Sequence, residues 1–178
     1  MKHRAWYYLI FFAAGVPALV YQVVWQRVLT LFFGVDVYST SITVASFMLG
    51  MGLGALAGGR WADRAGRPAT CYLLVEAGLG LFGALSLNLF VAVGNVLAGS
   101  PIAVLAPVVF LLLLIPTTLM GMTLPLMCRI VAAERQAIGR HLAWLYGANT
   151  LGAAVGAALT SYVLLGVLGF ANVTYLAA

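Results

Sequence analysis

The sequence predicts an all-α membrane protein, and three observations carry this prediction. Of 178 residues, 64% are hydrophobic and 7% are charged, whereas a soluble domain has about 25% charged residues. Four long runs contain no charged residue: 5–26, 37–59, 77–128 and 142–178. A helix needs about 20 apolar residues to cross a bilayer, and the runs lack the alternation that is typical of barrel strands. The lipid bilayer is therefore the expected surrounding of this chain.

Turn-forming residues divide the charge-free runs into spans. Run 77–128 would extend about 78 Å as one helix, so we expect it to turn at 94–101, where Gly, Asn, Ser and Pro cluster. Gly166 and Gly169 bracket the turn expected in run 142–178. The predicted fold is a single polytopic transmembrane helical bundle, residues 1–178, with five full spans plus the start of a sixth: 5–27, 38–59, 69–93, 102–128, 141–166 and 170–178. Because the last segment is too short to cross a bilayer, we expect the sequence to be a fragment; a tail that lies in the membrane interface is the alternative.

The basic residues predict how the bundle is oriented. Arg27 alone lies on one side of the predicted membrane. The other eight lie on the opposite side: Lys2, Arg4, Arg60, Arg64, Arg67, Arg129, Arg135 and Arg140. Basic residues of short loops stay in the cytoplasm, so the N-terminus is predicted to be cytoplasmic. We expect a bacterial inner (plasma) membrane, and the net charge of +5 is explained by an anionic leaflet without a nucleic-acid partner.

The loop after the second predicted span carries a recognisable pattern, Gly59-x-x-x-Asp63-Arg64-x-Gly66-Arg67. In spelling and position it resembles the cytoplasmic loop motif of major facilitator superfamily transporters. The resemblance implies that the glycine lets helices approach closely, and that the charged residues hold the cytoplasmic side closed. A basic loop that serves orientation alone is the alternative.

Four segments carry a closer resemblance: ALVYQVVWQR (18–27), the span ending in GGRWADR, PTTLMGMTLPLMCR (116–129) and GRHLAWLYGANTLGAAVGA (139–157). They resemble the membrane portion of spermidine-synthase-like integral membrane proteins, in which a half-size major facilitator bundle is fused to an aminopropyltransferase-like domain. Polyamines are the solutes that this resemblance suggests. The sequence has no Gly-rich loop after a strand and no acidic active-site cluster, so we expect no enzyme activity, cofactor or metal in this chain.

Small residues recur every fourth position on two predicted spans and mark faces for close helix packing. The positions are Gly50, Gly54 and Gly58 on the second span, and Ala148, Gly152 and Gly156 on the fifth. Major facilitator proteins consist of two six-span halves with the substrate between them, so a single half needs a partner. The small faces could join span two to span five of a second copy, as in a homodimer, or to another half-bundle. They could equally pack within one bundle.

Polar side chains inside the spans are the candidates for a substrate cavity, because they are expensive in lipid. Glu76 lies about 12 Å along the third span from Pro68; it could bind a proton or cation, or pair with Arg140 as a structural clamp. The other candidates lie at the end of the first span and on the fifth: Tyr21, Gln22, Trp25, Gln26, Arg27, Tyr146 and Asn149. For the first-span group the alternative is an interfacial aromatic belt, with Arg27 reaching towards Asp36.

Two functions are compatible with these features. The first is a half-size transporter module for a small polar solute, working as a dimer or with a second half. The second is a non-transporting membrane module that anchors or serves a soluble synthase domain. One acidic side chain at depth is few for a strongly cationic solute, and Arg27 would tolerate an anion, so the sequence leaves the substrate open.

Overall fold

The computed structural model describes residues 2–131 and 138–178, with side chains from Trp6 onward except at positions 36, 138 and 140. The regular secondary structure of these residues consists of helices: α1 (Lys2–Phe33), α2 (Asp36–Arg64), α3 (Pro68–Val96), α4 (Ile102–Val131), α5 (Ile138–Leu159), the π-helix η2 (Thr160–Leu164) and α6 (Leu165–Ala177). Five helical stretches within the described residues are long and apolar enough to cross a membrane. The prediction of an all-α chain with five helices long and apolar enough to span a membrane is confirmed.

α1 ends where the backbone allows a turn and not at the charged residue Arg27. α1 continues past Arg27 to Phe33, because the residues that follow are apolar except Thr30 and a long arginine side chain can extend towards the polar boundary. It ends at Gly34, whose φ of 66° is readily adopted only by glycine. The backbone N–H of Gly34 donates a hydrogen bond to the carbonyl of Thr30 at 2.8 Å. α3 begins with Pro68 in its first turn, where a missing N–H costs nothing.

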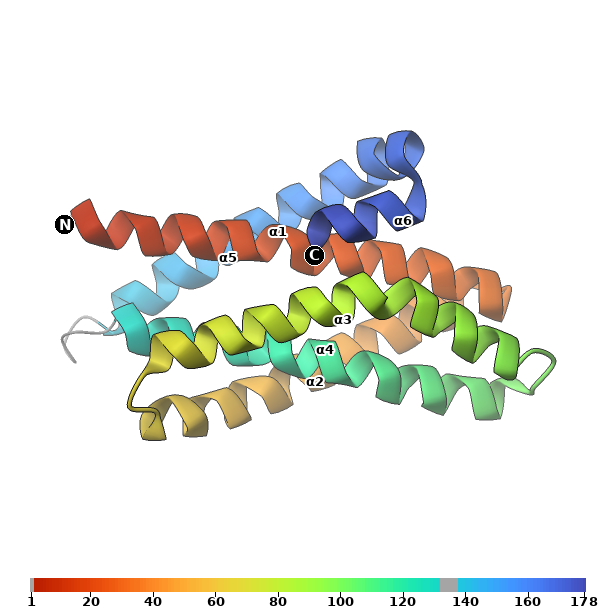
Figure 1. Cartoon of the computed structure of the whole chain (residues 1–178), viewed down its shortest axis with the longest axis horizontal. Coiled ribbons are helices and arrows are strands. Elements are labelled where there is room, and N and C mark those ends of the chain that lie inside the picture. Colours follow the sequence, from red (N-terminus) through yellow and green to blue (C-terminus); the bar gives the residue numbers. More distant parts are fainter. Residues whose placement is uncertain (1, 132–137) are drawn as a thin grey trace.

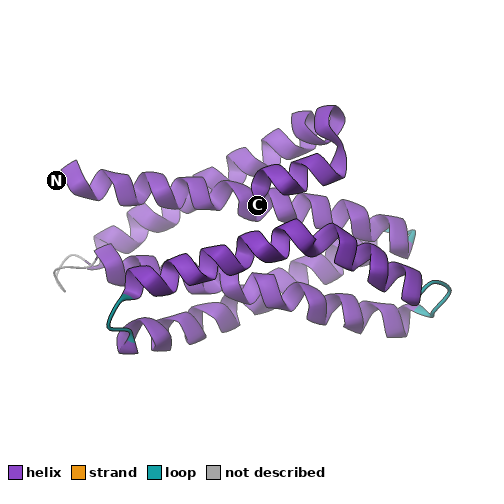
Figure 2. Ribbon diagram, viewed as in Figure 1, coloured by secondary structure: helices purple, strands orange, loops and turns teal. Residues whose placement is uncertain are grey.

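The long helices run up and down through one bundle (Figure 1). The N-terminus and the α2–α3 loop lie at one end, and the α1–α2 and α3–α4 connections lie at the other. Figure 2 shows that the described loops are short. The two most extensive helix pairs are α2 with α4 and α1 with α5, and in each pair the helices run in the same direction. The bundle is therefore assembled from pairs that are distant in sequence.

The chain reverses at Gly169, inside the segment that forms α6. Gly169 has φ 71° and ψ 171°, which interrupts the helix, whereas Gly166 remains helical. Beyond this point the chain folds back towards the middle of the bundle (Figure 1), where α6 contacts α1 and α3. Of the two glycines that bracket the predicted turn, Gly169 is the one that makes it.

Both small-residue faces pack inside the bundle. A Cβ atom added to Gly54 would lie 2.8 Å from the Cα of Gly121 on α4, and one added to Gly58 would lie 2.7 Å from the Cα of Met122. Gly50 of α2 lies against Thr117, which is also on α4. On α5, Gly152 and Gly156 lie against the backbone of Phe12 and Val16 in α1. These two faces hold the α2–α4 and α1–α5 pairs together, and within the chain they are already covered.

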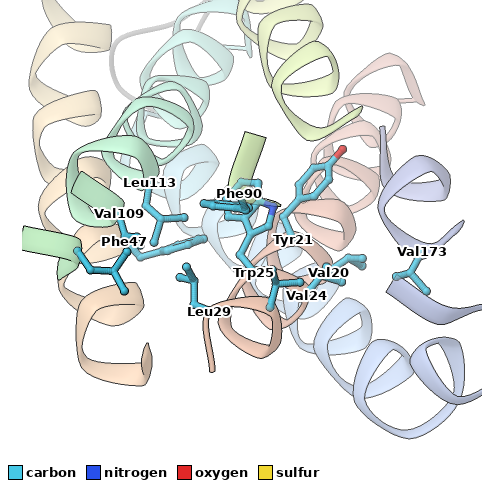
Figure 3. Close-up of a cluster of buried hydrophobic side chains, with 12 residues drawn as sticks. Val20, Tyr21, Val24, Trp25, Leu29, Phe47, Phe90, Val109, Leu113 and Val173 are labelled. Atoms are coloured by element: carbon cyan, nitrogen blue, oxygen red, sulfur yellow. The ribbon is translucent and has the colours of Figure 1, made fainter. Parts of the chain in front are cut away.

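Aromatic rings fill the core between α1, α2 and α3. Trp25 is fully buried and stacks on Tyr21, with ring centroids 5.2 Å apart. Phe82 and Phe90 of α3 meet its ring edge-on at centroid distances of 5.7 and 6.0 Å. Its Nε1–H donates a hydrogen bond to Ser86 Oγ at 3.0 Å. Figure 3 shows Tyr21, Trp25 and Phe90 gathered in this cluster.

Large apolar side chains also cover much of the outer surface. Leu73 is 66% exposed, Leu111 61% and Leu151 64%, and these residues lie on α3, α4 and α5. A soluble monomer seldom exposes so much contiguous apolar surface. Lipid tails are the surroundings that suit such an exterior.

Candidate functional site: a cavity between the helices

A cavity of about 680 Å³ lies among α1, α2, α3, α4 and α5, with the end of α6 beside it. Its size is within the range of small-molecule sites. Most of the lining is apolar, and α1 contributes one face at helical spacing: Ala14, Pro17, Ala18, Tyr21 and Gln22. The polar groups include one carboxyl group and two amides, from Glu76, Gln22 and Asn149. Hydroxyl groups come from Tyr21, Thr123, Tyr146 and Thr150.

Five of the eight predicted cavity residues line this space, and they come from three different helices: Tyr21, Gln22, Glu76, Tyr146 and Asn149. Asn149 lies at the α1–α5 contact, where a Cβ atom added to Gly15 would be 2.9 Å from its Oδ1. Tyr146, by contrast, is 59% exposed. One part of the polar lining is thus fixed by close helix packing, and another lies at the open side.

Glu76 is the charged side chain of the cavity lining, as far as the described residues reach. Its Oε1 is buried and has no hydrogen-bond partner in the described part of the chain. The hydroxyl of Tyr72, one helical turn earlier, is close enough to interact with the carboxyl group but does not adopt hydrogen-bonding geometry. The proposed clamp partner, Arg140, has a side chain outside the described residues. A carboxyl group with an unused acceptor, beside a cavity, is able to bind a ligand that donates a hydrogen bond or carries positive charge.

Trp25 is a correction to the sequence prediction. It does not line the cavity, and it is not part of an interfacial belt, because its ring is 0% exposed inside the aromatic core. Its N–H bonds to Ser86, so its polar atom is satisfied within the protein. The sequence showed that Trp25 lies beside Tyr21 on one helix, but not that three phenylalanines surround it.

Gln26 and Arg27 also lie away from the main cavity. Gln26 Nε2 donates a hydrogen bond to Thr40 Oγ1 at 3.0 Å, and the residue lines a separate pocket of about 90 Å³ together with Gln22. Arg27 is exposed and lines neither pocket. The side chain of Asp36, its suggested partner, is outside the described residues. Arg27 therefore gives no reason to expect an anionic ligand in the cavity.

The motif was predicted as a loop, but Gly59, Asp63 and Arg64 lie in the last turns of α2, and only Gly66 and Arg67 lie between α2 and α3. Asp63, Arg64, Gly66 and Arg67 are all exposed. A Cβ atom added to Gly59 would meet no described residue within 4 Å, so in the described part of the chain this glycine does not make the close approach that the resemblance implies. The preceding residue, Gly58, makes it instead against Met122.

Three methionines and a phenylalanine of the cavity lining were not predicted: Met48, Met51, Met120 and Phe47. Met48 and Met51 are three residues apart and so share a face of α2. Helical spacing alone does not distinguish such a face from one that meets lipid. The sequence feature that could have indicated this lining is the pair of methionines, because flexible thioether side chains are typical of adaptable binding surfaces.

Buried polar contacts elsewhere tie the helices together. Tyr8 of α1 and His141 of α5 share a hydrogen bond of 2.8 Å between the Tyr8 hydroxyl and His141 Nδ1, at the end of the bundle where α5 begins. Within residues 2–131 and 138–178, no group of three His, Cys, Asp or Glu side chains is placed to hold a metal ion.

Comparison with models of known protein families, with curated proteins and with solved structures finds no match to this chain.

Proposed function

We propose that this chain is a membrane transport module for a small polar solute, built like one half of a major facilitator carrier. The observation that carries the proposal is the cavity of about 680 Å³. It lies among spanning helices and combines a carboxyl group with amides and hydroxyls. Such groups are energetically costly inside a membrane, and where they occur they usually mark a functional site. The resemblance of the α2–α3 loop to the major facilitator motif supports the same function and a cytoplasmic N-terminus.

The cavity also supports a working unit of two halves. Its exposed lining residues include Met48 (74%) and Met51 (46%) of α2, and Tyr146 (59%) of α5. In a single bundle this side would open the polar lining to lipid. A second copy, or a different half-bundle, placed over α2 and α5 would close it. This partner surface differs from the small-residue faces, which are used inside the chain.

Uptake into liposomes tests transport directly. Vesicles containing the purified chain would be exposed to a mixture of amino acids, sugars and amines, and their contents measured by mass spectrometry. We expect at least one solute to enter faster than into empty vesicles. Removing the charge with Glu76→Gln should lower that flux by at least about tenfold, since a hydrogen bond to a charged group contributes about 1.5–3 kcal/mol.

Gln22→Ala and Gln26→Ala form a matched pair for this assay. Gln22 lines the main cavity, whereas Gln26 is bonded to Thr40 outside it. Loss of one neutral hydrogen bond of about 1 kcal/mol should lower flux about fivefold for Gln22→Ala, with little change for Gln26→Ala. If empty vesicles, wild type and all variants gave identical flux, transport would be excluded, and anchoring of a synthase-like domain would remain.

Cross-linking tests the two-half arrangement. Cys71 and Cys128 are free thiols and would first be replaced by alanine. Met48→Cys and Tyr146→Cys would then be placed on two differently tagged copies, which are co-expressed and treated in membranes with a short bismaleimide. We expect a covalent dimer carrying both tags, in a yield limited to the mixed pairs among randomly assorted dimers. Leu73→Cys with Leu111→Cys, two positions equally exposed on α3 and α4, should give monomer, and equal dimer from both pairs would contradict this interface.

A further inference from the structure

The charge of the cavity lining has one sign. Glu76 is its carboxyl group, and no Lys, Arg or His of the described chain is among the lining residues. The remaining polar groups, those of Gln22, Asn149 and the hydroxyl side chains, are neutral. The exposed Arg27 lies outside the cavity. A ligand in this space therefore meets one acidic side chain and, among the described residues, no basic one.

Aromatic and thioether groups make up a second part of the lining. The rings of Tyr21, Phe47 and Tyr146 border the cavity, and the face of an aromatic ring attracts a cation within about 6 Å of its centroid. Met48, Met51 and Met120 add flexible, polarizable side chains, which adapt to apolar groups of different shape. This part of the surface suits a bulky apolar body whose charge is positive.

We propose that the cavity binds monovalent lipophilic organic cations, with the Glu76 carboxylate as counter-ion and the aromatic and methionine side chains around the apolar body. This inference rests on the proposed transport function, and it assigns the same cavity a lipophilic cation in place of a small polar solute. It follows from the juxtaposition of a single carboxylate with a lining that is otherwise neutral and largely apolar. A ligand with several positive charges would leave all but one of them unpaired here, at a high cost in desolvation.

Equilibrium binding of radiolabelled tetraphenylphosphonium to the purified full chain in lipid nanodiscs is the primary test. We expect saturable binding to wild type. Glu76→Gln should raise Kd at least about tenfold, since it removes the counter-ion but keeps the shape of the side chain. Gln26→Ala changes a polar side chain that bonds to Thr40 outside the cavity and should leave Kd unchanged. Binding that is not saturable, or equal Kd values for wild type and Glu76→Gln, would overturn the proposal.

Tetraphenylborate provides the control for charge, because it has nearly the same shape and the opposite sign. We expect it not to compete with tetraphenylphosphonium at concentrations where the unlabelled cation competes fully. Equal competition by the anion would show that the cavity selects apolar bulk alone, and would overturn the proposal.

A measurement on wild type keeps the test valid if Glu76→Gln does not fold. Dicyclohexylcarbodiimide modifies carboxyl groups within membranes, and mass spectrometry of the peptides locates the modified residue. Saturating tetraphenylphosphonium should slow modification of Glu76 at least fivefold, and an unchanged rate would contradict the proposal. If Glu76→Gln and Arg140→Gln instead lowered thermal stability equally and the cation gave no protection, Glu76 would be a structural clamp, and the proposal would fail.

The binding and transport experiments can fail separately. Binding of tetraphenylphosphonium that depends on Glu76, without flux of any solute, would remove the transport proposal and keep the ligand class. Flux of a neutral solute, without binding of the cation, would keep transport and remove the ligand class.

Discussion

Gly54→Val should prevent stable association of α2 with α4. A Cβ atom at position 54 would overlap the backbone carbonyl of Thr118 and lie 2.8 Å from the Cα of Gly121. Both neighbours are backbone atoms, so no rotamer change relieves the overlap. The helices must separate, and they then lose the dispersion contacts that hold membrane helices together. We expect the free energy of unfolding in mixed micelles to fall by about 3 kcal/mol, at the upper end of overpacking effects.

Gly52→Val is the matched control, because it places the same side chain two residues earlier in the same helix. A Cβ atom at Gly52 meets nothing within 4 Å, and the residue is exposed. Its unfolding free energy should therefore stay within about 0.5 kcal/mol of wild type, and Gly54→Ala should lie between the two valine variants. Equal destabilisation by Gly52→Val and Gly54→Val would mean that helix propensity, and not close packing, determines the loss.

The spanning helices could be predicted because lipid imposes a simple requirement on the sequence. Charge-free runs of sufficient length define helices, and Glu76 stands out for the same reason, as an ionisable group inside the predicted span 69–93. The repeat of small residues also identified the packing faces at Gly54 and Gly152. These features depend on one helix and its solvent, and they need no knowledge of neighbouring helices.

What the sequence did not determine is which helix meets which face. Gly58 and Gly59 differ by one position, but one residue rotates the side-chain direction by about 100°. Gly58 continues the four-residue repeat of Gly54 and meets α4, while Gly59 points into open space. A shared helix face is not sufficient either: Gln22 and Gln26 are one turn apart, but only Gln22 lines the main cavity. The shape of the cavity depends on contacts between helices that are distant in sequence, and hydropathy carries no information about those contacts.

Trp25→Ala should produce the second large effect, through loss of the aromatic core. Trp25 is fully buried, and its ring lies within 6.2 Å, centroid to centroid, of the rings of Tyr21, Phe47, Phe82 and Phe90. Truncating a buried tryptophan costs about 3–5 kcal/mol in soluble proteins. In a bilayer the unfolded reference is also apolar, so the transfer part of this cost is small and the unfilled cavity dominates. We therefore expect a loss of about 3 kcal/mol in the free energy of unfolding.

Two further variants separate packing from hydrogen bonding at this position. Trp25→Phe keeps most of the ring but removes the Nε1–H that bonds to Ser86 at 3.0 Å. Hydrogen bonds between membrane helices contribute about 0.6 kcal/mol on average, so Trp25→Phe should cost much less than Trp25→Ala. Trp144→Ala, at a tryptophan that is 65% exposed, should be nearly neutral. A loss at Trp144 as large as that at Trp25 would mean that tryptophan contributes through contact with lipid headgroups, and the buried aromatic cluster would then not be what holds α1 to α3.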